Sequence, residues 1–213
     1  MKNIEVKIGD FLGEKVLRPI RSKRDIILLL LDTMKLIVNP EGSFSDDSGK
    51  VIICVDKMSR IFYETKVKYF SFIFPFLIEN INQNYKIYDN HTECELNDRM
   101  ISLLISIFQQ ENLWGSSLEK AMDIIIDSAE EYEYSDIDTI WKLIIKLWHM
   151  EDGYIRYDYD PVNEDGDIHP LYHFDINYSS AATYKIGLNN PIKVNDFQNI
   201  LNIKTKCSYL RIV

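Results

Sequence analysis

Residues 153–188, GYIRYDYDPVNEDGDIHPLYHFDINYSSAATYKIGL, decide the fold that this sequence predicts. Between residues 171 and 178 apolar and polar side chains alternate, which is typical of a strand because successive strand residues point to opposite faces. The same alternation runs through residues 154–160 and 182–188, and the small residues at 179–181 favour a turn. We therefore expect three strands of an antiparallel meander that has one apolar and one polar face.

The polar face of this meander collects most of the side chains that could carry chemistry. The first two strands contribute charged or titratable residues at alternate positions, and the third contributes one lysine. One more histidine precedes the second strand in the segment His-Pro-x-x-His-x-Asp. We predict that these side chains form one binding surface, which comprises Arg156, Asp158, His169, His173, Asp175 and Lys185.

Upstream of the meander the sequence predicts mainly helices. Residues 21–38 predict a helix because the start signal Ser22-x-x-Asp25 precedes an apolar run. Residues 51–55 and the aromatic-rich residues 62–76 predict strands. Apolar stripes of helical period predict three successive helices, at 97–110, 117–132 and 136–150. A short helix at 195–202 and an edge strand at 207–213 complete the chain.

These elements together predict an α+β fold in a single domain, residues 1–213. Residues 1–150 would form a helix-rich N-terminal and central body, and residues 151–213 would form a small C-terminal antiparallel β-meander with a tail. The broad apolar face of the helix at 136–150 would cover the apolar side of the meander.

Composition limits the class of protein and of partner. The 213 residues are 46% apolar and 27% charged, as in a soluble globular protein, and the formal net charge is −9. Because so acidic a chain repels phosphate backbones, we expect no direct binding of nucleic acid. Cys54, Cys94 and Cys207 lack disulfide or zinc-site spacing, and we find neither a signal peptide nor a membrane-spanning run. We expect a cytoplasmic protein that does not enter a membrane.

One interpretation of the polar face is a catalytic metal site. His169, His173 and Asp175 would hold a divalent metal, Zn or Mn, because imidazole nitrogen and carboxylate oxygen suit these ions. Arg156, Asp158 and His173 would be the catalytic residues, with Arg156 on a phosphate group and a histidine as general acid or base. Hydrolysis of a phosphate ester or nucleotide is the reaction that these residue types favour.

A second interpretation is that the polar face is solvated and needs no cofactor. Arg156 and Lys185 would then pair with Asp158 and Asp175 as exposed cross-strand ion pairs, each contributing a fraction of a kcal/mol. Neither an H-E-x-x-H motif nor a serine or cysteine nucleophile motif accompanies the histidines. A solvated face, a binding surface and a metal site therefore all stay open.

Two further segments have compositions that suggest ligand binding. Residues 160–167, DPVNEDGD, suggest a calcium loop, but aligning Gly166 with the loop glycine puts Pro161 at the first carboxylate position and Tyr172 at the closing glutamate. The aromatic residues at 62–76 could stack nucleic-acid bases, yet the chain offers little basic surface around them. We predict an exposed acidic loop and core packing, respectively.

The segment His169-Pro-x-x-His173-x-Asp175 lies between an upstream R-Y-D and a downstream Y-K-I-G-L. Residues 156–188, which contain these motifs, resemble the C-terminal part of small uncharacterised prokaryotic proteins that occur near mobile-element and phage-defence genes. The resemblance implies a genomic setting and no activity.

The leading functional expectation is an accessory protein that binds a partner protein, of the immunity or complex-forming type, in a prokaryotic conflict or defence system. Its acidic charge would speed association with a basic partner. The metal-dependent hydrolase is the alternative, and the oligomeric state is not predicted.

Overall fold

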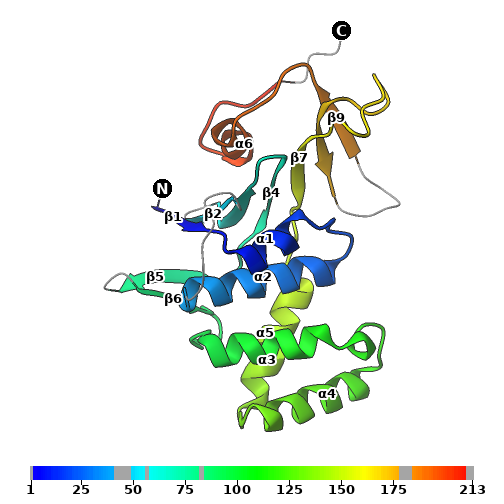
Figure 1. Ribbon diagram of the computed structural model, residues 1–213. Helices are drawn as coiled ribbons and strands as arrows, with labels where there is room; N and C mark the ends of the chain where they lie inside the picture. Colours follow the sequence, from blue (N-terminus) through cyan, green and yellow to red (C-terminus); the bar gives the residue numbers. More distant parts are fainter. Residues whose placement is uncertain (1, 41–48, 56–57, 82–83, 178–183, 210–213) are drawn as a thin grey trace. The chain divides into compact units, whose positions relative to one another are not determined.

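The protein is described here by a computed structural model that covers residues 2–40, 49–55, 58–81, 84–177 and 184–209. Its residues divide into two compact units (Figure 1). The first unit comprises residues 1–9, 44–74 and 153–213, and the second comprises residues 10–43 and 75–152. No helix in the described ranges is both long enough and apolar enough to cross a membrane.

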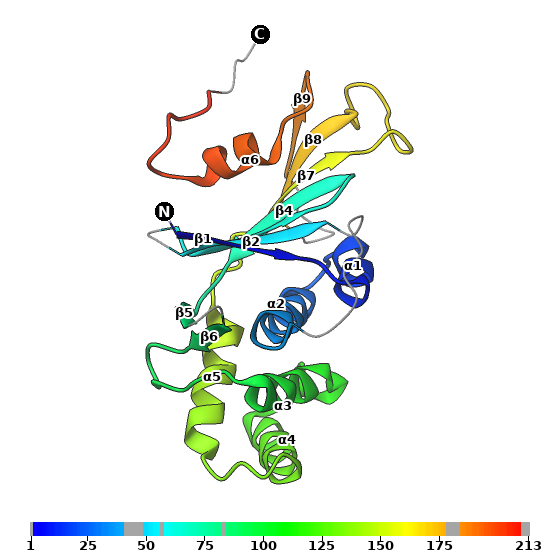
Figure 2. The same ribbon diagram turned by 60° about the vertical axis from the view of Figure 1, so that its left-hand side comes forward.

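The first unit is built on an antiparallel sheet, which in the described residues has seven strands in the order β1-β2-β3-β4-β7-β8-β9 (Figure 2). Each strand pairs with the next one in that order. The strands are β1 (Lys2–Lys7), β2 (Lys50–Val55), β3 (Arg60–Glu64), β4 (Lys68–Ile73), β7 (Ile155–Tyr159), β8 (Tyr172–Ile176) and β9 (Tyr184–Leu188).

The predicted fold, a helical body on a small C-terminal meander, is wrong. β7, β8 and β9 do form an antiparallel meander, but β4 pairs with β7, so the meander continues a sheet whose other four strands come from the N-terminal third. Alternation within a segment reveals a strand and the side on which its apolar residues lie. It does not reveal a pairing partner that is far away in the sequence. For that reason the prediction separated the N-terminal strands from the C-terminal meander, although all of them belong to one sheet.

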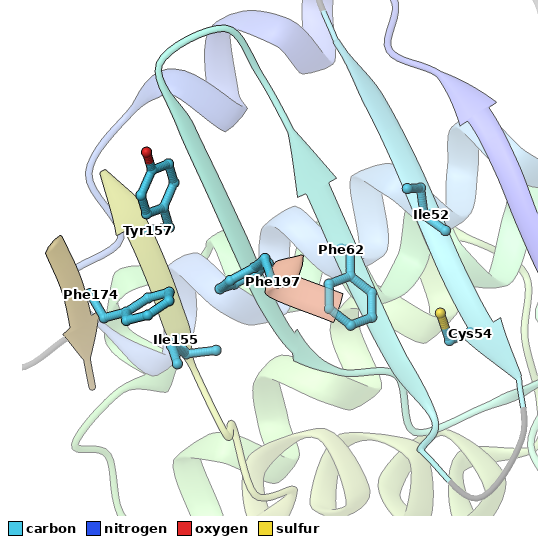
Figure 3. Close-up of a cluster of buried hydrophobic side chains, with 7 residues drawn as sticks. All are labelled: Ile52, Cys54, Phe62, Ile155, Tyr157, Phe174 and Phe197. Carbon is cyan, nitrogen blue, oxygen red and sulfur yellow. The ribbon is translucent and has the colours of Figure 1, made fainter. Parts of the chain in front are cut away.

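Helix α6 (Val194–Leu201) packs on the apolar face of this sheet (Figure 3). Phe197 is fully buried, and its ring centroid lies 6.0 Å from that of Phe62 and 6.1 Å from that of Phe174. The prediction that one face of the meander is apolar is therefore confirmed. The helix packed there within this unit is α6, whereas the predicted helix at 136–150 belongs to the second unit.

The aromatic stretch at 62–76 contributes to the core as predicted, although it contains two strands, β3 and β4, rather than one. The rings of Phe62, Tyr63, Phe70 and Phe72 are completely buried. Tyr63 and Phe70 stack at a centroid distance of 4.6 Å. Because these rings face protein rather than solvent, they offer no platform for nucleic-acid bases.

The second unit is mainly helical. α1 packs with α2, α2 with α3 and with the hairpin strand β6, α3 with α4, and α4 with α5. The elements are α1 (Asp10–Leu17), α2 (Lys23–Val38), β5 (Leu77–Ile81), β6 (Asn84–Tyr88), α3 (Asp98–Gln109), the short 3-10 helix η1 (Glu111–Leu113), α4 (Leu118–Glu131) and α5 (Ile137–His149).

The predicted helix starts in this unit are confirmed. Ser22 and Asp25 form a capping box at α2, in which the Asp25 backbone N–H donates to Ser22 Oγ. Ser117 and Asp136 cap α4 and α5 in the same way, each accepting from the N–H three residues on. The sequence did not reveal α1 or the β5–β6 hairpin, whose short segments carry no strong period.

Part of the predicted C-terminal structure cannot be compared. The turn at 179–181 and its flanking residues lie outside the described ranges, as do residues 210–213. Residues 207–209 are described and form no strand, so the described part of the predicted edge strand is absent.

Candidate functional site

The register of β7, β8 and β9 places the predicted polar residues in two rows on one face of the sheet. Asp158 lies opposite His173, which lies opposite Gly187. Arg156 lies opposite Asp175, which lies opposite Lys185. Because directly opposed residues in an antiparallel sheet point to the same side, the alternation in the sequence correctly grouped these side chains.

Arg156 joins the two carboxylates of this face. Its Nε lies 2.7 Å from Asp158 Oδ2, and its Nη2 donates to Asp175 Oδ2. Burial alone would lower the pKa of Arg156, but Asp158, Tyr154 and Asp175 raise it, so the guanidinium stays charged. The arginine that we predicted to hold a phosphate is thus already engaged by protein carboxylates.

Most of the polar face is buried, contrary to the interpretation as solvated cross-strand pairs, although Lys185 is exposed. Only 1% of His173 and 5% of Asp175 is exposed, and the Asp158 side chain is 14% exposed. Burial raises the pKa of Asp158 even though Arg156 opposes that effect. The cost of burying these charges must be met by pairing within the face.

The ring of His173 is held by the chain just before it. Its Nδ1 donates to the carbonyl oxygen of Pro170 at 2.8 Å, and its Nε2 faces the carboxylates. Nε2 lies 3.7 Å from Asp158 Oδ2 and 4.0 Å from Asp175 Oδ1. Gly187 makes room for this arrangement, since a Cβ at that position would lie 2.9 Å from Pro170 Cγ.

His169 makes a different set of contacts from the one predicted. Lys185 Nζ donates to its Nδ1 at 2.7 Å, and its Nε2 donates to Asp160 Oδ2 at 3.2 Å. Its ring centroid lies 4.7 Å from that of His173, but both of its nitrogens are used within the protein. The group that the structure brings together as possible metal ligands is therefore Asp158, His173 and Asp175, with Asp158 in the place predicted for His169.

This face also includes Lys68, which the sequence did not place there, and Tyr154, which the alternation placed on the side of Arg156 and Asp158 but without a role. Lys68 lies opposite Asp158 across the β4–β7 pair, and burial together with the charge of Arg156 lowers its pKa to about 8. Burial raises the pKa of Tyr154, next to β7, to about 12. Alternation in β4 predicts on which face of the strand Lys68 lies. It does not predict that Lys68 lies opposite Asp158, because that contact depends on the β4–β7 pairing.

The loop between β7 and β8 is exposed from residue 161 to residue 168. Two apolar side chains in it face solvent: Val162 is 87% and Ile168 is 80% exposed. Residues 160–171 contain four acidic residues and neither lysine nor arginine. An exposed acidic loop was predicted, and its exposure is confirmed.

This loop is ordered by its own hydrogen bonds. The N–H of Asp165 donates to the carbonyl of His169 at 2.9 Å, and the N–H of His169 donates back at 3.2 Å. Asp160 Oδ1 accepts from the N–H of Asn163 at 3.1 Å, which closes a turn. Val162 and Ile168 are thus presented on a backbone that is shaped before any partner arrives.

A pocket of about 470 Å³ in the second unit is a further concave feature. It lies between the loop at 89–92 and one side of α5, where Trp141 and Ile145 supply an apolar wall. Lys146 at its edge pairs with Asp89, so these two charges satisfy each other. This pocket could not be predicted from the sequence, because its two walls come from segments about 50 residues apart.

No protein-family model, no curated protein and no solved structure matches this chain.

Proposed function

We propose that this protein is an accessory protein that binds a basic partner protein through the β7–β8 loop, residues 160–171. The observation that carries the proposal is the combination of Val162 and Ile168, both more than three-quarters exposed, with acidic neighbours on an internally bonded loop. Exposed apolar patches that are rimmed by polar residues mark protein-binding sites, and these two side chains would form the centre of such a patch.

Charge selects the chemistry of the partner. Asp160, Glu164, Asp165 and Asp167 lie in the loop without a basic residue between them, and the whole chain carries a formal net charge of −9. Such a field attracts a basic surface and repels an acidic one, so it raises the rate of encounter and excludes many partners. The partner that fits is a protein with an apolar pocket rimmed by lysine or arginine.

The preformed backbone lowers the cost of binding. A loop that is disordered before binding loses conformational entropy when it is ordered, and that loss weakens the complex. Here the paired N–H and carbonyl groups of Asp165 and His169 already fix the loop. Association with a prokaryotic defence system rests only on the resemblance of residues 156–188.

The hydrolase alternative has weaker support. It assigns Arg156 to a substrate phosphate, whereas Arg156 is only partly exposed and its guanidinium pairs with Asp158 and Asp175. A phosphate would have to displace one of these buried carboxylates, which is costly because the displaced charge would remain in the protein.

The test is affinity capture from a native lysate of the source cells, with the wild-type chain and matched variants. The double substitution Val162→Ser and Ile168→Ser removes the apolar contacts, and Leu118→Ser, at a 65% exposed position in the second unit, is the control. We expect wild type and control to retain the same stoichiometric protein, and the loop variant to lose it. Retention that is equal for the loop variant, or no stoichiometric protein with wild type, overturns the proposal.

A charge-reversed loop gives an independent check. Lysine at positions 164, 165 and 167 in place of Glu164, Asp165 and Asp167 should abolish capture, and capture by the wild type should weaken as salt rises. Capture that does not respond to salt or to the reversal would exclude a basic partner.

A further inference from the structure

The described residues contain one group of histidine and acidic side chains that lie close enough together to hold a metal ion. It consists of Asp158 on β7 and of His173 and Asp175 on β8. One carboxylate oxygen of each aspartate and one nitrogen of the histidine all lie within 4.8 Å of one another.

The first observation is the orientation of His173. Its Nδ1–H donates to a backbone carbonyl, and its Nε2 therefore points toward Asp158 and Asp175. Histidine ligands in metal sites usually carry this second hydrogen bond, which fixes the orientation of the ring and of the ligating nitrogen. The ring is thus oriented as that of a metal-ligating histidine would be.

The second observation is independent of the histidine. Asp175 Oδ1 is buried and accepts no hydrogen bond from any of the described residues, whereas its Oδ2 is paired with Arg156. The side chain is only 7% exposed, so water cannot freely serve as its partner. Buried carboxylate oxygens are normally satisfied, and a cation bound between this oxygen and the histidine nitrogen would satisfy it.

We propose that Asp158, His173 and Asp175 bind one divalent transition-metal ion, Zn²⁺ or Mn²⁺. Two donors that are each about 2.1 Å from a tetrahedrally coordinated ion lie about 3.4 Å apart. The distances from His173 Nε2 to the carboxylate oxygens, 3.7 and 4.0 Å, are a few tenths of an ångström longer. Small side-chain rotations would close the gap, and mixed nitrogen and oxygen donors suit these two ions.

The surrounding cations set the strength of the site. Arg156 pairs with both carboxylates, and Lys68 lies opposite Asp158, so a metal ion must compete with two positive charges. We therefore expect weaker binding than at structural zinc sites, whose ligands have no such competitors. The ion would lie at the base of the β7–β8 loop, since Asp158 precedes that loop and His173 follows it.

The experiment is calorimetric titration of the untagged full chain, treated with a chelator and dialysed, with Zn²⁺ and with Mn²⁺. We expect one ion per chain. His173→Gln and Asp175→Asn each remove a ligand with little change in volume and should weaken binding by at least about 100-fold. His169→Gln and Asp165→Asn change neighbouring residues outside the ligand set and should leave the affinity little changed.

A measurement on the wild-type chain guards against variants that do not fold. Mn²⁺ broadens the NMR signals of nearby nuclei, so substoichiometric Mn²⁺ should first remove the amide signals of residues 156–158 and 173–175. Absence of binding by the wild type overturns the proposal. Broadening centred on residues 160–167, or affinity lost in the His169 variant but kept in the His173 variant, also overturns it.

Discussion

Lys146, in the last turn of α5, forms an ion pair with Asp89, whose side chain is only 1% exposed. Asp89 also accepts hydrogen bonds from the backbone N–H groups of His91 and Thr92, at 3.1 and 2.8 Å. One buried carboxylate therefore fixes the loop that follows β6 and attaches α5 to it.

Removing the cation of this pair should destabilise the protein. Lys146→Met leaves a buried carboxylate without its charged partner, and we expect a loss of about 2–3 kcal/mol in the free energy of unfolding. Lys142→Met is the matched control on the same helix, because its partner Asp138 is exposed and the pair is solvated. Urea unfolding of the three proteins measures both effects, and equal losses would contradict the role of Asp89.

The same pair predicts a dependence of stability on pH. Burial by itself would raise the pKa of Asp89, but the hydrogen bonds from Lys146 and Thr92 outweigh it and hold the pKa below its usual value. A carboxyl whose pKa is lowered by folding stabilises the protein above its unfolded pKa, about 3.9, and loses that contribution as the pH falls through its folded pKa.

Comparison of wild type with Asp89→Asn isolates this contribution. The difference in free energy of unfolding should be constant from pH 7 to about pH 5 and should shrink below about pH 4. Urea titrations at closely spaced pH values measure it. A difference that grew on acidification would show that the sign is reversed.

Phe197 predicts how α6 is held on the sheet. Phe197→Ala removes a fully buried ring that lies near Phe62 and Phe174, and we expect a loss of about 3–5 kcal/mol. Ile200→Ala, at a 38% exposed position on the same helix, should cost less than about 1 kcal/mol. Thermal or urea unfolding of both variants distinguishes a docked helix from a loosely attached one.

The cysteines report on the same contact. Burial raises the pKa of Cys54 to about 11, and its side chain belongs to the cluster around Phe197, whereas Cys207 is exposed. We expect a thiol reagent at pH 8 to label Cys207 rapidly and Cys54 only on unfolding. Mass spectrometry of labelled peptides measures this, and Phe197→Ala should accelerate labelling of Cys54. Rapid labelling of Cys54 in the wild type would contradict the packing of α6.

The sequence predicted local structure better than long-range pairing. The Ser22 capping box and the three helices at 97–150 were found because start signals and apolar periods are local properties. The sheet was underestimated because its decisive contact, Tyr69 opposite Tyr157 in the β4–β7 pair, joins two strands with a helical segment between them. A pattern within either strand carries no information about that partner.

The polar face was predictable in membership but not in environment. Alternation correctly grouped Arg156, Asp158, His173 and Asp175, because the face of the sheet to which a side chain points is set by its position within its own strand. Whether that face is exposed to solvent depends on which segments cover it, and alternation within a strand does not predict those segments. The position of His169 was not predictable either, because it lies in a loop whose conformation depends on its own hydrogen bonds.

The β4–β7 pairing has a consequence for synthesis of the protein on the ribosome. While residues 74–154 are being translated, β4 is the open edge of an unfinished sheet, and its backbone N–H and carbonyl groups on that side await β7. Strand edges of this kind invite pairing with other nascent chains. The segment made in the meantime folds largely from local helices, which form faster than long-range strand pairs. If this helical segment folds early, it becomes more compact, and fewer conformations of the chain have to be searched before β7 pairs with β4.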